Sequence, residues 1–189
     1  MIRSLVTLAF CALATHAGAV DQNDRYAVKG PGKLKCGTFA ALDPTHEHVR
    51  DAGVWLTGYF TAHNRLLRET YDLLPWQTPG TVLALAAQYC RAHPEAQLND
   101  AAAELVGYMA SRRVTEEAPG VVLRSGGSVT VVYAPIVEDI RDALREAGQD
   151  LGPDAEDLEA ALKLYQQAQD LPVTGIPDQP TLLKLLADR

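Results

Sequence analysis

The chain has 189 residues, of which 47% are apolar and 22% charged, and its formal net charge is −7 at pH 7. This composition suffices for one large or two small hydrophobic cores. The negative charge argues against nucleic acid and against anionic membrane surfaces as partners.

The first 19 residues have the composition of a secretory signal peptide. Arg3 precedes an apolar run of 12 residues, 4–15, and residues 17–19 (Ala-Gly-Ala) supply the small-x-small pattern of a cleavage site. The run is shorter than the roughly 20 residues that a membrane-spanning helix needs. We therefore expect cleavage after Ala19, export to the periplasm of a Gram-negative bacterium, and no integral membrane segment. An uncleaved anchor is the alternative.

Two cysteines, Cys36 and Cys90, follow the signal segment. In an exported chain a single even pair predicts one disulfide. A bridge that closes a loop of about 55 residues stabilises the fold by roughly 4 kcal/mol in the chain-entropy treatment. The alternative, a catalytic thiol, needs a base partner and a reducing compartment.

The middle of the chain predicts an arm and then a helical domain. Residues 20–35 are polar, contain Gly-Pro-Gly, and predict an extended arm. From 36 to 113, apolar residues recur at three- and four-residue steps, which predicts helices over about 48–68, 79–92 and beyond 99. Thr78 is a good N-cap, Pro79 suits a first helical turn, and Asn99 is the expected cap of the third helix.

The periodicity changes in residues 118–135, and we assign residues 114–134 to a linker between the two domains. Two β-branched runs flank Ser-Gly-Gly-Ser at 125–128, which predicts a β-hairpin. Because a two-stranded ribbon alone is only marginally stable, it either packs on a helical neighbour or serves as a semi-ordered connector.

Residues 135–189 predict a three-helix domain. Asp154 is the expected cap of its second helix and Asp178 the cap of its third. The inward side chains of the third helix are expected to be Leu182, Leu183, Leu185 and Leu186. The expected fold is thus mainly α, with two small helical domains joined by a short β-hairpin-like linker.

Three motifs stand near the end of the chain: Ala-Leu-x-x-Tyr-Gln at 161–166, Leu-Pro-Val-Thr-Gly at 171–175, and Thr-Leu-x-x-Leu at 181–185. Over residues 136–186 the chain resembles the peptidoglycan-binding domains of bacterial cell-wall proteins. The resemblance implies a groove for the wall peptide near the glutamine and the polar turn. The candidate binding residues are Gln166, Gln169, Thr174 and Asp178. The segment 149–154 is shorter than the family's loop, which shortens one wall of the expected groove.

Residues 35–112 carry a second resemblance. Cys36 precedes a Leu-Asp pair, a Trp-Leu-Thr-Gly-Tyr helix follows at 55–59, and Cys90 stands shortly before Pro94. This order resembles the HdeA/HdeB periplasmic acid-stress chaperones and related immunity proteins of type VI secretion systems. It implies action on an unfolded client or a toxin, without a fixed catalytic residue.

The sequence contains no motif for catalysis. His46 and His48 share one side of an extended segment, but a zinc site needs a third protein ligand and no His-Glu-x-x-His motif is present. There is also no Gly-x-Ser-x-Gly elbow and no phosphate-binding glycine loop. We predict no metal, no cofactor and no enzymatic activity. Trp76, in a loop between two prolines, is the candidate exposed contact to a partner, whereas Trp55 is expected in the core.

These observations predict a non-catalytic, periplasmic, wall-associated protein. Its C-terminal domain would bind peptidoglycan and its disulfide-bonded domain would meet a protein partner. The alternative is an acid-stress chaperone or an immunity protein that neutralises a wall-degrading toxin, with the C-terminal domain as a tether.

Overall fold

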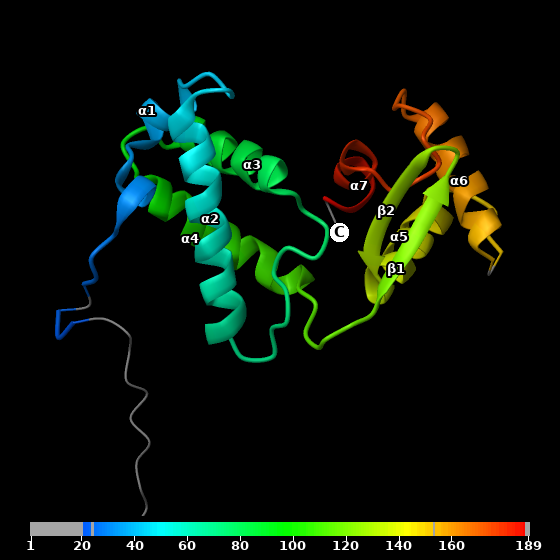
Figure 1. Cartoon of the computed structure of the whole chain (residues 1–189), viewed down its shortest axis with the longest axis horizontal. Helices are drawn as coiled ribbons and strands as arrows, with labels where there is room; N and C mark the ends of the chain where they lie inside the picture. The colour runs from blue at the N-terminus through cyan, green and yellow to red at the C-terminus, as the bar shows by residue number, and fades with distance from the viewer. Residues whose placement is uncertain (1–20, 24, 153, 188–189) are drawn as a thin grey trace, which may run out of the picture.

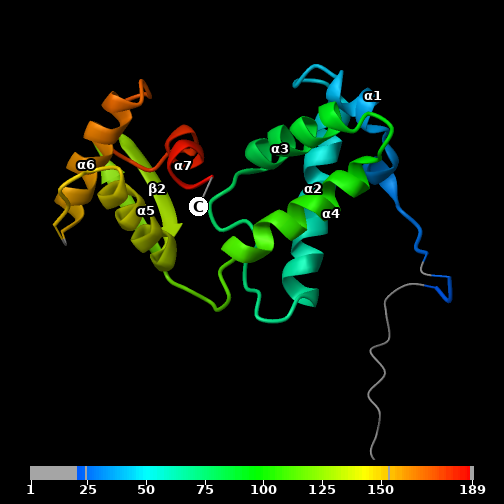
Figure 2. The same ribbon diagram turned by 180° about the vertical axis from the view of Figure 1, so that it is seen from behind.

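The computed structural model describes residues 21–187 except 24 and 153. The predicted signal peptide, residues 1–19, lies outside the described residues. The chain forms two helical modules with separate hydrophobic cores, and α7 (Gln179–Leu186) lies on the side of the C-terminal module that faces the N-terminal one (Figures 1 and 2). The predicted mainly helical fold with one small hairpin is confirmed.

The N-terminal module contains four α-helices. They are α1 (Cys36–Ala40), α2 (Glu47–Leu66), α3 (Pro79–Ala92) and α4 (Leu98–Met109), with short 3₁₀ helices at Gly30–Lys33 and Ala110–Arg112. Thr78 caps α3 as predicted, because its side chain accepts a hydrogen bond from the Thr81 N–H. None of the helices within residues 21–187 is both long and apolar enough to cross a membrane.

The prediction that Asn99 caps the third helix is wrong. Gln97 is the N-cap of α4, and it forms a reciprocal capping box with Asp100. Asn99 lies inside the helix and is buried, where its amide donates to the Tyr26 hydroxyl at 2.8 Å. That contact fastens the N-terminal arm to α4.

The predicted disulfide between Cys36 and Cys90 is present, and both residues are completely buried. It joins the start of α1 to the end of α3. The surrounding core is apolar and comprises mainly Phe39, Ala52, Leu56, Phe60, Leu73, Val82, Ala86, Leu98, Leu105 and Met109.

The hairpin consists of β1 (Gly120–Ser125) and β2 (Ser128–Tyr133), paired antiparallel. Gly126 has a φ of 54°, as the first central position of a type II′ turn requires. Leu123 and Val132 are buried in the same core as the C-terminal helices. Of the two possibilities that the sequence left open, the hairpin therefore packs on a helical neighbour.

The C-terminal helices are α5 (Ala134–Glu146), α6 (Ala155–Ala168) and α7. Asp154 caps α6 through a capping box with Asp157, and Asp178 caps α7 by accepting from the Thr181 N–H at 3.0 Å, as predicted. Leu183, expected inside, is instead 37% exposed, because the inward stripe of this short helix is filled by Leu182, Leu185 and Leu186.

The two modules are joined by side-chain hydrogen bonds as well as by the chain. The Gln179 amide nitrogen donates to the Trp76 carbonyl, and its oxygen accepts from the Thr78 N–H and the Thr81 hydroxyl. The Tyr108 hydroxyl donates to the Ala187 carbonyl. Both ends of α7 are therefore fastened to the N-terminal module.

Candidate functional site

Gln166 organises the turn between α6 and α7. Its amide nitrogen lies 3.0 Å from the Thr174 hydroxyl and 2.9 Å from both the Ile176 carbonyl and the Thr181 hydroxyl. Its amide oxygen accepts from the Gly175 N–H at 2.8 Å. The side chain is 0% exposed, so it shapes the turn from inside and has no surface that a ligand can touch.

Thr174 and Asp178 form the half-buried outer layer of the same cluster. The Thr174 hydroxyl donates to Asp178 Oδ2 at 2.8 Å, while Oδ1 accepts from the Thr181 hydroxyl at 2.6 Å. Gln169 is exposed at the C-cap of α6, outside this hydrogen-bonded cluster. The structure thus brings three of the four candidate residues together, and two of those three reach the surface.

A hollow of about 220 Å³ adjoins this turn. Its lining comes from β1, from α6 and from Gly175 in the turn. The lining residues are Val122, Leu123, Arg124, Glu156, Leu158, Glu159, Leu162 and Gly175. We call this hollow the β1–α6 groove. The sequence analysis did not predict that β1 lines this groove, because β1 and α6 are some 30 residues apart and no local sequence pattern links them.

The β1–α6 groove has charges of both signs. Arg124 is exposed on β1, and Glu156 is exposed on α6. Glu159 accepts from Lys163 Nζ at 2.6 Å and from the Ser125 hydroxyl at 2.8 Å, and these hydrogen bonds hold the pKa of its carboxyl below the ordinary value. A groove with a guanidinium on one wall and carboxylates on the other complements a short peptide that bears both a carboxylate and an ammonium group.

Gly175 fixes how closely the turn approaches the hairpin. Its φ is 69°, in the left-handed region that favours glycine. A Cβ at this position would lie 2.5 Å from the Ser125 hydroxyl oxygen and 2.6 Å from Lys163 Cε. Glycine at this position therefore lets the turn, the hairpin and α6 approach one another closely without strain.

The candidate partner contact, Trp76, is half-buried and packs against the core of the C-terminal module. Trp55 is also half-buried and packs against the N-terminal core. Within residues 21–187 no group of three or more His, Cys, Asp or Glu side chains is placed to hold a metal ion. His46 instead caps α2 by accepting from the His48 N–H at 3.1 Å.

Residues 134–185 match the family described as putative peptidoglycan binding domain. The match extends from the start of α5 into α7, and it includes the turn built on Gln166. The hairpin and the N-terminal module lie outside it. No curated protein and no solved structure matches the chain at a significant level.

Proposed function

We propose that the protein is an exported, non-catalytic component of the cell-wall compartment that binds peptidoglycan through its C-terminal module. The family match over residues 134–185 carries this proposal. The Cys36–Cys90 disulfide supports export, since such bonds persist in oxidising compartments.

Within this module, the proposed contact surface combines the turn with the β1–α6 groove. Thr174, Asp178 and Gln169 offer polar groups at the surface of the turn, and Arg124 offers a cation beside it. Gln166 acts through the turn that it holds in place. The wall peptide, which carries carboxylates and an amine, is the part of peptidoglycan that this surface suits.

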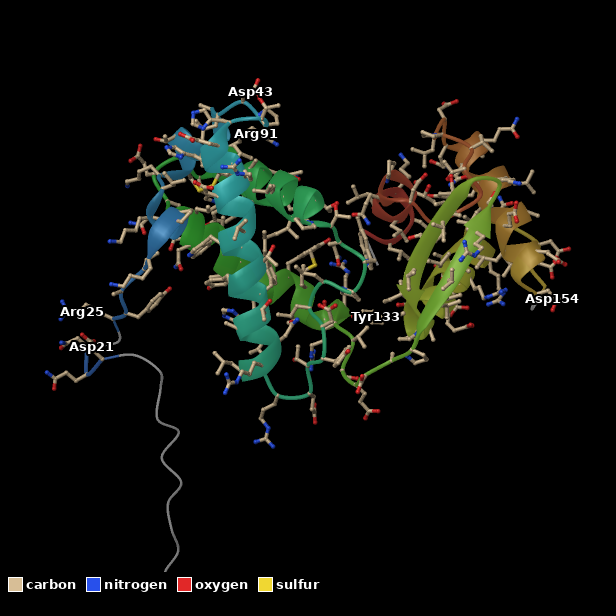
Figure 3. The ribbon with its side chains drawn as sticks, viewed as in Figure 1. Asp21, Arg25, Asp43, Arg91, Tyr133 and Asp154 are labelled. Atoms are coloured by element: carbon tan, nitrogen blue, oxygen red, sulfur yellow. A yellow bond between two sulfur atoms is a disulfide. The ribbon has the colours of Figure 1, made fainter. Side chains whose placement is uncertain are left out.

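The test is retention of the full chain on purified sacculi after sedimentation. Arg124→Glu places a carboxylate beside the carboxylates of the groove and is expected to lower retention several-fold. Arg91→Glu makes the same charge change at an exposed position of α3, in the other module, and should leave retention unchanged (Figure 3). Failure of the full chain to sediment with sacculi would overturn the proposal, and equal retention of both variants would remove the groove from it.

A second candidate assigns the activity to the N-terminal module. The observation that favours it is the exposure of two apolar side chains of α2, Val54 and Leu66, which are 71% and 72% exposed. In this form the module binds an unfolded client or a toxin while the C-terminal module tethers it. Suppression of client aggregation, measured at neutral and acid pH, tests the chaperone form. No suppression at either pH leaves only the toxin-neutralising form.

A further inference from the structure

A second hollow lies where the two modules meet, apart from the β1–α6 groove. Its volume is about 340 Å³, and Ile136 and Leu186 from the C-terminal core form its apolar floor. Around this floor stand Trp76 and Arg112 from the N-terminal module and Asp139 and Asp142 from α5. We call it the junction hollow. Its size and its place between two modules are typical of small-molecule sites.

Trp76 is held in place on the wall of the junction hollow before any ligand arrives. Its carbonyl accepts from Gln179 Nε2, and the oxygen of the same amide accepts from the Thr78 N–H at 3.1 Å and from the Thr81 hydroxyl. The indole packs against the C-terminal core. A side chain ordered by the fold loses little further conformational entropy on binding, which favours affinity.

The polar groups of the junction hollow have capacity for a ligand. The Arg112 guanidinium lies 4.3 Å from the centre of the Tyr108 ring, and the Asp142 carboxylate accepts from Arg145 at 2.7 Å. A guanidinium carries five N–H donors and a carboxylate about four lone-pair sites. Arg112 and Asp139 also have further interactions within the protein. A guanidinium and a carboxylate can each make several hydrogen bonds at once, so hydroxyl or amide groups of a ligand can bond to them in addition.

We propose that the junction hollow binds one sugar unit of a glycan strand. A pyranose ring has an apolar face of C–H groups for the indole and a rim of hydroxyls for the carboxylates and the guanidinium. Two carboxylates beside one guanidinium disfavour an anion such as phosphate. The choice of a wall glycan rests on the proposed function, whereas the form and chemistry of the hollow do not depend on it.

Tryptophan fluorescence of the full chain provides the test, because the chain has only two tryptophans. Trp55→Phe leaves Trp76 as the single reporter. Titration with a β-1,4-linked N-acetylglucosamine tetramer is expected to shift its emission saturably to shorter wavelength. Trp76→Phe, which leaves Trp55 as the reporter, is expected to show no change. The change to phenylalanine keeps a ring at residue 76, and circular dichroism checks that each variant is folded.

The carboxylates of the junction hollow are tested in the Trp55→Phe background. Asp142→Asn is expected to weaken tetramer binding about tenfold, because a hydrogen bond to a charged acceptor is replaced by a weaker one to a neutral acceptor. Glu138→Gln changes an exposed carboxylate on α5 outside the lining of the hollow and should leave the affinity unchanged. If both substitutions change the affinity equally, the carboxylates of the junction hollow are not contacts to the sugar.

Absence of a saturable Trp76 shift up to about 10 mM tetramer, or a shift produced only by the wall peptide, would overturn the sugar site. Retention on sacculi is measured in parallel with the same protein. Retention without tetramer binding removes the sugar site and leaves the proposed function intact. Tetramer binding without retention supports the sugar site and removes the proposed function.

Discussion

Replacing Gln166 with leucine tests whether this residue holds the turn from inside. Leucine has a similar volume, so the change removes hydrogen bonds without opening a large cavity. The buried Gly175 N–H loses its acceptor, whereas the buried Ile176 carbonyl loses one donor and keeps the Asp178 N–H at 2.9 Å. The Thr174 and Thr181 hydroxyls keep Asp178 as their acceptor.

One buried backbone group, the Gly175 N–H, is therefore left without its acceptor. A buried polar group without a partner costs about 1–3 kcal/mol, so the free energy of unfolding should fall by about 2 kcal/mol. That is a large part of the roughly 5–15 kcal/mol that stabilises a typical domain.

Urea unfolding followed by far-UV circular dichroism measures the loss. Gln169→Ala is the matched control, because it removes the same residue type from an exposed position at the C-cap of the same helix. Its free energy of unfolding should change by no more than about 0.5 kcal/mol. A loss below about 1 kcal/mol in Gln166→Leu, with an unchanged denaturant slope, would refute the structural role. If the unfolding experiment shows that Gln169→Ala keeps its stability, a decrease in its retention on sacculi reports a direct contact.

Three further predictions concern the bridge, the turn and the groove. Replacing Cys36 and Cys90 together with alanine should lower the free energy of unfolding by about 4 kcal/mol, measured by urea unfolding against the oxidised parent. Gly175→Ala should destabilise more than Gly126→Ala, because both glycines have positive φ but only at Gly175 would a Cβ meet other atoms within 4 Å; equal losses in thermal unfolding would contradict this. The folded pKa of Glu159 lies below its ordinary value of 4.5, so its contribution to stability is present above that value and disappears as the pH falls through the folded pKa. Glu159→Gln should therefore flatten the decline of the melting temperature below about pH 4.5, and an unchanged decline would show that other carboxyls cause it.

Features governed by neighbours in sequence were predictable. Thr78, Asp154 and Asp178 act as N-caps because a capping side chain needs only an N–H two or three residues later. Asn99 failed as a cap because Gln97 competes for the same helix end and Tyr26 takes the Asn99 amide. Tyr26 is 73 residues earlier in the sequence, so the residues next to Asn99 could not indicate this contact.

The candidate site was predictable in its residue types but not in its exposure. The resemblance singled out Gln166, yet burial depends on how the turn folds back over α6. The groove wall at β1 depends on the hairpin meeting α6, which follows from tertiary packing alone. Trp76 lies in a loop between two prolines, and loop residues are commonly exposed. It is half-buried here, and its carbonyl accepts a hydrogen bond from Gln179, which is 103 residues later in the sequence.

Two adjacent residues at the start of α7 serve different parts of the molecule. Asp178 caps the helix and closes the turn beside the β1–α6 groove, while Gln179 fastens residues 76–81 at the junction hollow. Because a helix of eight residues moves as one unit, the turn and the junction share a single rigid support. A wall peptide at the turn and a sugar beside Trp76 would then both be bound next to segments that α7 holds in place.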